Sequence, residues 1–260
     1  MLLLALLLRL LYALLAGIAA AFALAPWTRE AFVRYGKTRQ PLATHGRPAR
    51  QAAAAVVALE RFAAWTVPKN WFSQFYYVGA GVGIPLLLGE CHWAWFHRGP
   101  RLPGMPAARV LGIAALLEHP RDGSIAAPSA HAALALLMYV AHVLVRLKET
   151  VFDQPPTDAT MHIGQYAVGL LFYVATPFAL VVDAHDCHGW APAPPLMVLA
   201  GLAVFAHASL HQRRCHRILF DLRRGSLRAA RRARAYAIPS GDLFGHVSSP
   251  HFLCEILIYA

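Results

Sequence analysis

The chain begins with the apolar segment LLLALLLRLLYALLAGIAAAFAL, residues Leu2 to Leu24, which is interrupted only by Arg9. A helix needs about 20 consecutive apolar residues to cross the hydrocarbon core of a bilayer, so this run is long enough to span a membrane. A cleaved secretory signal is the competing interpretation, because Ala23-Leu24-Ala25 resembles a small-residue cleavage site. A retained first transmembrane helix is favoured, because no basic region precedes the run and further apolar segments follow it.

The composition of the whole chain agrees with a membrane protein. Of the 260 residues, 58% are hydrophobic and 14% are charged, and the mean hydropathy is +0.45. An average soluble domain is more polar and more charged. The formal net charge of +11 would suit a nucleic-acid-binding protein, but the Lys and Arg residues lie between long apolar runs and form no recognisable nucleic-acid module. The sequence therefore predicts an integral membrane protein with no nucleic-acid partner.

Further apolar segments follow the first one. They run approximately from Trp71 to Phe96, from Ile125 to Leu147, from Met161 to Val182, and from Leu196 to Leu210. Two basic blocks, Arg29–Lys69 and Arg213–Arg234, lie outside these segments, whereas the loop Asp183–Pro195 contains no Lys or Arg. The positive-inside bias therefore places both basic blocks in the cytosol and the loop without Lys or Arg on the far side.

These segments together define the expected fold. We predict an all-α, polytopic transmembrane helical bundle of five to seven spans that forms one membrane-embedded domain over residues 1–260. Cytosolic basic loops are expected at residues 27–70 and 211–246. The four cysteines show no CxxC spacing, and lipid-spanning helices need no disulfide staples, so free thiols are expected.

Two motifs have structural explanations. The segment Gly79–Gly83 resembles a dinucleotide-binding loop, but no strand precedes it, so close helix packing through Gly79 and Gly83 is the preferred interpretation. The loop segment His185–His188 offers atoms that ligate metals, yet four adjacent residues of a short loop cannot all turn toward one ion. We therefore predict no metal site.

Two polar features lie at the ends of apolar segments. In HVLVRLKE, the spacing i, i+4 and i+7 places His142, Arg146 and Glu149 on one helical face. This stripe is either a solvated helix end with ion pairs or the wall of a polar pocket. Glu255 lies within the apolar run near the C-terminus, where an ionisable residue is costly and by default marks a binding site.

Four stretches spread over most of the chain form a recognisable set. They are VRYGKTR (Val33–Arg39), VPKNWFSQFY (Val67–Tyr76), HVLVRLKETVF (His142–Phe152), and HQRRCHRILFDLR (His211–Arg223) followed by IPSGDLFGHVSSPHFLCEILIY. In this order they resemble the steroid 5-alpha-reductase family. The SSPH and VPK elements resemble the polyprenol reductase branch rather than the steroid or enoyl-CoA branches. Members of the family continue past the Glu-containing helix, so the resemblance implies a truncated C-terminus.

The resemblance implies a multi-pass enzyme of the endoplasmic reticulum membrane. Such an enzyme uses NADPH to saturate the alpha-isoprene double bond of polyprenal or polyprenol on the route to dolichol, which supports protein N-glycosylation. Its implied partners are the polyprenyl lipid substrate and membrane lipid, without a metal. The alternatives are a 3-oxo-5-alpha-steroid 4-dehydrogenase, an enoyl-CoA reductase, and a catalytically inactive truncated membrane protein.

The resemblance also implies a set of residues that face the cofactor. Carried over by position, they are Arg146, Gln212, His216, Arg223, Tyr236, His251 and Glu255. Arginines suit the phosphates because their forked donors make charge-assisted hydrogen bonds. Glu255 and His251 are suited to hold the nicotinamide carboxamide that aims the hydride, which gives both a catalytic role.

The chemistry of hydride addition favours one of the two candidate substrates, polyprenal and polyprenol. A hydride does not add readily to an isolated alkene, but it adds to the beta-carbon of an enal, where the negative charge moves to the carbonyl oxygen. Polyprenal is therefore favoured over polyprenol as the electrophile. The protein must donate a hydrogen bond to this developing oxyanion. The candidate donors are Tyr76 and Gln74, which lie near a membrane edge in the Val67–Tyr76 stretch.

Overall fold

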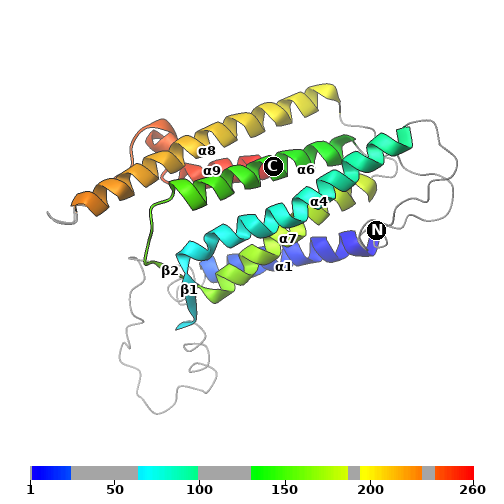
Figure 1. The fold of residues 1–260 in the computed structure, drawn as a ribbon. Helices are drawn as coiled ribbons and strands as arrows, with labels where there is room; N and C mark the ends of the chain where they lie inside the picture. Colours follow the sequence, from blue (N-terminus) through cyan, green and yellow to red (C-terminus); the bar gives the residue numbers. More distant parts are fainter. Residues whose placement is uncertain (1, 25–63, 99–129, 187–193, 230–237) are drawn as a thin grey trace, which may run out of the picture. The chain divides into compact units, whose positions relative to one another are not determined.

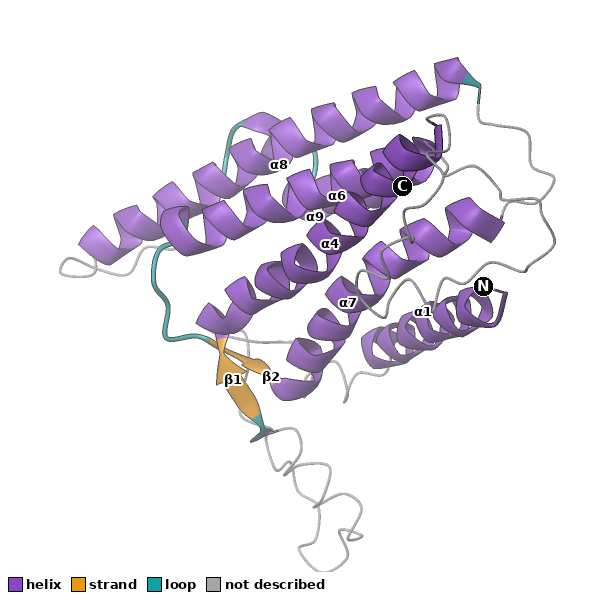
Figure 2. Cartoon of the chain, turned by 45° about the vertical axis from the view of Figure 1, so that its right-hand side comes forward, coloured by secondary structure: helices purple, strands orange, loops and turns teal. Residues whose placement is uncertain are grey.

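The computed structural model describes residues 2–24, 64–98, 130–186, 194–229 and 238–260, and most of them are helical (Figures 1 and 2). The elements, in chain order, are α1 (Leu2–Leu24), β1 (Thr66–Pro68), η3 (Lys69–Trp71), α4 (Phe72–Arg98), α6 (Ala130–Lys148), η4 (Glu149–Asp153), β2 (Thr160–His162), α7 (Ile163–Asp186), α8 (Pro195–Ala229), η5 (Asp242–Gly245) and α9 (Pro250–Tyr259). The chain divides into two compact units. The first unit is Met1–Val143 with Thr157–His188, and the second is Leu144–Pro156 with Gly189–Ala260.

Four segments of the described helices are long and apolar enough to cross a membrane. They are Lys69–His92, His131–Asp153, Ile163–Val182 and Pro195–Gly225. These segments correspond to the second to fifth predicted spans. α1 has the predicted bounds, and the apolar helical stretch found within it, Leu4–Ile18, is shorter than the other four. The predicted all-α, polytopic membrane fold is confirmed.

One predicted loop is partly helical. The fifth predicted span ends at Leu210 and a loop is predicted at residues 211–246, but α8 continues through the basic residues to Ala229. The physical reason is that Arg and Leu are good helix formers, so a run rich in both does not end a helix. A helix of 35 residues is about 50 Å long, which exceeds the roughly 30 Å hydrocarbon core. Its apolar and basic parts therefore belong to one continuous element.

A small antiparallel sheet joins the starts of α4 and α7. Its strands, β1 and β2, pair Val67 with Met161, and both side chains are buried. Beyond the sheet, the amide of Lys69 donates to the carbonyl oxygen of Ala159 at 2.9 Å. No strand is predicted from the sequence, because a three-residue strand leaves no recognisable period. These bonds fix the register between the first turns of the two helices.

α4 packs closely within the first unit through its glycines, and it lies beside α7 in both views (Figures 1 and 2). A Cβ atom on Gly79 would lie 2.8 Å from both Oη of Tyr139 and Cδ1 of Tyr173. A Cβ atom on Gly83 would lie 3.0 Å from Cε1 of Tyr139. The Tyr139 hydroxyl donates a hydrogen bond to the main-chain oxygen of Tyr173 at 3.0 Å. The predicted close packing through Gly79 and Gly83 is confirmed.

α1 is attached to α7 by a polar contact between two apolar helices. Tyr12 Oη lies 2.8 Å from Oγ1 of Thr176, which also donates to the main-chain oxygen of Phe172. The rings of Tyr12 and Phe172 meet edge to face at a centroid distance of 6.2 Å. These contacts satisfy the hydroxyl groups of both side chains within an apolar environment.

Replacing Gly79 with Ala should destabilise the first unit. The added methyl group lies at 2.8 Å from the hydroxyl oxygen of Tyr139 and from the ring of Tyr173, and overpacking of this kind costs about 1–3 kcal/mol. Gly81→Ala is the matched control, because nothing lies within 4 Å of its added Cβ atom and Ala favours a helix. Thermal unfolding in detergent should show a lower Tm for Gly79→Ala and an equal or higher Tm for Gly81→Ala. Equal Tm values for both variants would contradict the packing described above.

Candidate functional site

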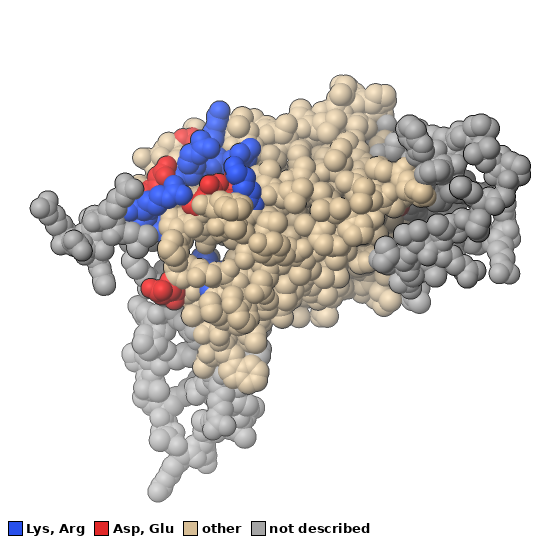
Figure 3. Space-filling model, viewed as in Figure 1, with Lys and Arg blue, Asp and Glu red and all other residues tan. Residues whose placement is uncertain are grey.

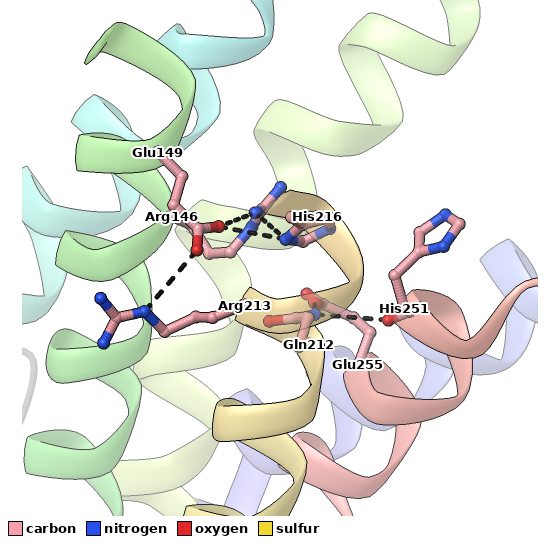
Figure 4. Close-up of polar contacts among 7 residues, drawn as sticks. All are labelled: Arg146, Glu149, Gln212, Arg213, His216, His251 and Glu255. Atoms are coloured by element: carbon pink, nitrogen blue, oxygen red, sulfur yellow. Dashed lines mark hydrogen bonds and ion pairs between the residues drawn. The ribbon is translucent and has the colours of Figure 1, made fainter. Parts of the chain in front are cut away.

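The second unit contains a buried cluster of charged side chains around Glu149 (Figure 4). The carboxylate of Glu149 accepts a hydrogen bond from Nη1 of Arg146. Nδ1 of His216 lies 3.0 Å from the same carboxylate and 2.5 Å from Nη1 of Arg146. Nε of Arg213 lies 3.8 Å from the other carboxylate oxygen. The side chains of Arg146, Glu149 and His216 are 8–11% exposed, so the cluster is largely removed from solvent.

The local backbone explains how Glu149 reaches this position. Glu149 follows Arg146 by three residues, a spacing that brings two side chains together on a helix. It also begins the π-helical turn η4, in which the amide of Gln154 donates to the main-chain oxygen of Glu149 at 2.8 Å. Such turns are frequent at functional sites. The end of the predicted stripe is therefore buried and ion-paired rather than solvated.

A second group of contacts connects α9 to α8. Gln212 lies one helical turn before His216 and is 2% exposed. Its amide nitrogen donates to the carboxylate of Glu255 and to the main-chain oxygen of His251, the latter at 3.4 Å. The ring of His251 is 5.7 Å from the ring of His216, measured between centroids. The two groups of contacts therefore share the same face of α8 (Figure 4).

The turn before α9 is also attached to α8. Nδ1 of His211 lies 2.5 Å from Oδ1 of Asp242. Asp242 and Gly241 both have positive φ angles, of 46° and 94°, which is uncommon for a residue other than glycine. Cys215 and Cys254 are buried free thiols on α8 and α9, in agreement with the predicted absence of disulfides at these positions. The pairing between His211 and Asp242 holds this turn against the helix.

Arginine side chains occupy the exposed face of α8, and Figure 3 shows Lys and Arg gathered beside acidic residues. The exposed arginines are Arg213, Arg214, Arg217 and Arg224, whereas Arg223 is half-buried. Arg224 contacts the carboxylate of Asp221 at 3.1 Å and the main-chain oxygen of Asp153. The helix therefore presents a buried polar face and an exposed basic face.

The predicted cofactor-facing residues are largely brought together. The second unit gathers Arg146, Gln212, His216, His251 and Glu255. Arg223 lies two helical turns beyond His216 on α8, and Tyr236 lies outside the described residues. The structure describes no group of three or more His, Cys, Asp or Glu side chains that could hold a metal ion.

The predicted donors Tyr76 and Gln74 lie in the first unit, on α4. Tyr76 is 3% exposed and meets the ring of Tyr173 edge to face at 5.3 Å. Gln74 is half-buried, and its amide oxygen accepts a hydrogen bond from the hydroxyl of Tyr166. Tyr166 is not among the predicted site residues, because it lies inside an apolar segment where a tyrosine carries no distinguishing signal.

Arg213 and Glu149 belong to the charged cluster but not to the predicted cofactor-facing residues, although Glu149 is part of the predicted polar stripe. Arg213 lies among many arginines, so its sequence position carries no specific signal. Glu149 is different, because its i+3 spacing from Arg146 is visible in the sequence. This spacing indicates that Glu149 can form an ion pair with Arg146, which is a predicted site residue.

Removal of the Glu149 carboxylate should destabilise the second unit strongly. Glu149→Ala leaves Arg146 and His216 buried without their acidic partner, and breaking a buried ion pair costs about 3–5 kcal/mol. Asp221→Ala is the matched control, since Asp221 also pairs with an arginine but is 62% exposed. An exposed pair contributes only about 0–1 kcal/mol. Thermal unfolding should show the larger decrease in Tm for Glu149→Ala, and the opposite order would contradict the buried cluster.

A family model and several relatives of known name match this chain, and they agree with one another. The family model described as 3-oxo-5-alpha-steroid 4-dehydrogenase matches residues 159–260. Polyprenal reductase 2 of Arabidopsis thaliana is 34% identical over 240 residues, which cover 75% of this chain and 67% of that protein. Polyprenal reductase of Homo sapiens is 30% identical over 243 residues, covering 87% and 67%.

A third relative agrees with these two. Polyprenal reductase 1 of Oryza sativa subsp. indica is 33% identical over 237 residues, covering 76% of this chain and 65% of that protein. This chain thus spans about two thirds of the length of these relatives. No solved structure matches it. From the family model and the identities with these reductases, the chain belongs to the 3-oxo-5-alpha-steroid 4-dehydrogenase family, the steroid 5-alpha-reductases that its motifs resemble.

Proposed function

We propose that the protein reduces the alpha-isoprene double bond of polyprenal, with NADPH as the hydride donor, in a multi-pass enzyme of the endoplasmic reticulum membrane. The observation that carries this proposal is the identity with proteins named polyprenal reductase over three quarters or more of this chain. The product is the alpha-saturated aldehyde, which leads toward dolichol after a further reduction to the alcohol. The membrane-spanning helices suit a substrate with a long isoprenoid tail.

The side chains of the second unit fit a dinucleotide. Its phosphates require cationic donors, and α8 provides forked ones in arginines such as Arg223 and Arg217, whereas Arg224 is already engaged by Asp221 and Asp153. Its carboxamide has an NH₂ group that requires acceptors. The amide oxygen of Gln212 makes no hydrogen bond to another described side chain, and the carboxylate of Glu255 is an acceptor beside it. Gln212 would therefore hold the carboxamide together with Glu255, which the family resemblance pairs with His251 for this role.

Glu149 supports this donor set rather than contacting the cofactor. Arg146 and His216 are both buried, and each is held by the same carboxylate. A buried cation without an acidic partner is unfavourable and shifts its position or its protonation. The carboxylate therefore keeps both groups in one arrangement before the cofactor binds. Preorganised groups of this kind lose little entropy on binding.

The chemistry of the substrate sets what the protein must supply. Bound NADPH supplies a hydride, which the enal accepts at its beta-carbon. The pi electrons of the double bond then move toward the carbonyl, and the carbonyl oxygen becomes negative. A fixed hydrogen-bond donor stabilises this oxygen, and the alpha-carbon finally takes a proton. Helices packed in lipid exclude water, which strengthens the contribution of each donor.

There are two alternatives to this function, a reductase of a different conjugated carbonyl compound and an inactive protein. A reductase of steroid enones or of enoyl-CoA would use the same electron flow, because both substrates are conjugated carbonyl compounds. A catalytically inactive membrane protein would keep the helices without turnover. The names of the relatives favour polyprenal over both alternatives.

A reductase assay on membranes that contain this chain tests the function. NADPH is supplied with polyprenal, polyprenol, a steroid enone or an enoyl-CoA, and the alpha-saturated product is measured by mass spectrometry. We expect product from polyprenal, and none from polyprenol when its oxidation to the aldehyde is prevented. Product only from a steroid enone or an enoyl-CoA would replace the proposal. No product from any substrate, with the protein present in the membrane, would favour the inactive protein.

Arg223→Ala should raise the KM for NADPH more than the KM for polyprenal. The half-buried guanidinium lies on the same helix as Gln212 and His216, in the region proposed to bind phosphates. Loss of one charge-assisted contact of about 1.5–3 kcal/mol corresponds to an increase of roughly 10- to 100-fold. Arg224→Ala is the matched control, since its guanidinium is already engaged by Asp221 and Asp153. A larger effect on the lipid KM would place Arg223 at the substrate instead.

A further inference from the structure

The first turns of α4 and α7 meet at a pair of neutral polar side chains. The hydroxyl of Tyr166, on α7, donates a hydrogen bond to the amide oxygen of Gln74, on α4. Both side chains are half-buried, so each is partly accessible. The sheet β1–β2 fixes the relative position of these helix starts. The contact therefore joins two helices whose contacting residues are about 90 residues apart in the chain.

Aromatic side chains hold the phenol of Tyr166 in place. Its ring lies 5.5 Å from the ring of Trp71 and 5.4 Å from that of Phe75. Phe75 in turn stacks on Tyr173 with an interplanar angle of 8°. A Cβ atom on Gly169 would lie only 2.7 Å from Cζ of Phe75, so this glycine makes room for the stack. The hydroxyl of Tyr166 therefore has little freedom to leave Gln74.

The hydrogen bond from Tyr166 fixes which end of the amide is available. The amide oxygen is the acceptor, so the amide nitrogen of Gln74, with its two N–H groups, points elsewhere. Within the described part of the chain, no group accepts a hydrogen bond from this nitrogen. A side-chain amide that is anchored at its oxygen is a directed donor, of the kind that stabilises an oxyanion.

The depth of the pair suits the head of a long isoprenoid. Gln74 lies five residues into the candidate span Lys69–His92, and Tyr166 lies three residues into the span Ile163–Val182. At 1.5 Å per residue both lie within roughly 8 Å of a helix start. The exposed Trp65 and Trp71 flank this level, as expected at a membrane interface. The aldehyde of a polyprenyl lipid would lie at this level, with its tail among the apolar helices.

We propose that the amide nitrogen of Gln74 donates a hydrogen bond to the carbonyl oxygen of polyprenal, and that Tyr166 is a positioning residue that fixes the orientation of this amide. The inference rests on the proposed function and assigns the anchor of its substrate. Hydride addition at the beta-carbon makes the carbonyl oxygen negative, and the N–H of Gln74 stabilises this charge until the alpha-carbon is protonated. Of the two predicted donors, Gln74 is the more accessible, since Tyr76 is 3% exposed.

Three variants test the proposal. Gln74→Glu, assayed at a pH at which its carboxyl group is ionised, keeps an acceptor for Tyr166 but has no hydrogen-bond donor, and Tyr166→Phe removes the hydroxyl while keeping the ring contacts. Tyr77→Phe is the matched control, because it removes an exposed tyrosine hydroxyl from α4. We expect kcat for polyprenal to fall about 10²- to 10³-fold in Gln74→Glu, as for other lost oxyanion donors. Tyr166→Phe should lower kcat about 10-fold, and Tyr77→Phe should have no effect.

The double variant separates positioning from an independent role. If Tyr166 acts only through Gln74, Tyr166→Phe lowers kcat no further when Gln74 is already Glu. Multiplying effects in the double variant would overturn the positioning role, and a kcat within about twofold of the wild type in Gln74→Glu would overturn the donor role. The KM for NADPH should stay unchanged in all variants, because the proposal places these residues at the polyprenal carbonyl and not at the cofactor.

A binding measurement distinguishes failure of this inference from failure of the proposed function. The infrared carbonyl stretch of polyprenal bound without NADPH should shift to lower frequency in the wild type and in Tyr77→Phe, but not in Gln74→Glu. The shift with no turnover would reject the reductase function and keep the anchor. Turnover of polyprenal without a shift that depends on Gln74 would keep the function and reject the anchor. If Gln74→Glu fails to fold, the carbonyl shift and the turnover are compared in Tyr166→Phe instead, where a smaller shift than in the wild type is expected.

Discussion

The second unit depends on one buried carboxylate. Glu149 is the common partner of Arg146, Arg213 and His216, which come from the end of α6 and the middle of α8. The guanidinium groups of Arg146 and Arg213 would repel one another, and the carboxylate between them converts this repulsion into an attraction. The same stretch of α8 carries Gln212, which holds Glu255 of α9. One acidic residue at a π turn thus determines how three segments of the chain present their polar groups.

The two units carry different chemistry. The second unit presents charged and forked donors, which suit a phosphate-bearing cofactor, whereas the pair formed by Gln74 and Tyr166 in the first unit is neutral and framed by aromatic rings. Charged groups suit a phosphate-bearing cofactor, and a neutral donor suits an oxygen whose charge develops only during a reaction. A neutral donor also costs less to bury in a membrane than an ionised one.

The sequence predicts the membrane fold well and the site in part. The span Met161–Val182 is readable because apolar length is a one-dimensional signal, and Gly79 because small residues permit close helices. The extension of α8 to Ala229 is hidden, since hydropathy ends a span at its last apolar residue although the helix continues. The contact between Tyr166 and Gln74 depends on the packing of two distant segments, which no local pattern encodes.

Because α8 is unbroken, insertions and deletions within it are poorly tolerated. Buried and exposed positions alternate along the helix, with Gln212 and His216 on one face and Arg213 and Arg217 on the other. Because an α-helix has 3.6 residues per turn, one inserted or deleted residue rotates everything beyond it by about 100°. Such a change between Ala208 and Arg223 would turn arginines inward. Variation in length is therefore confined to places outside this helix, while single substitutions on its exposed face remain permissible.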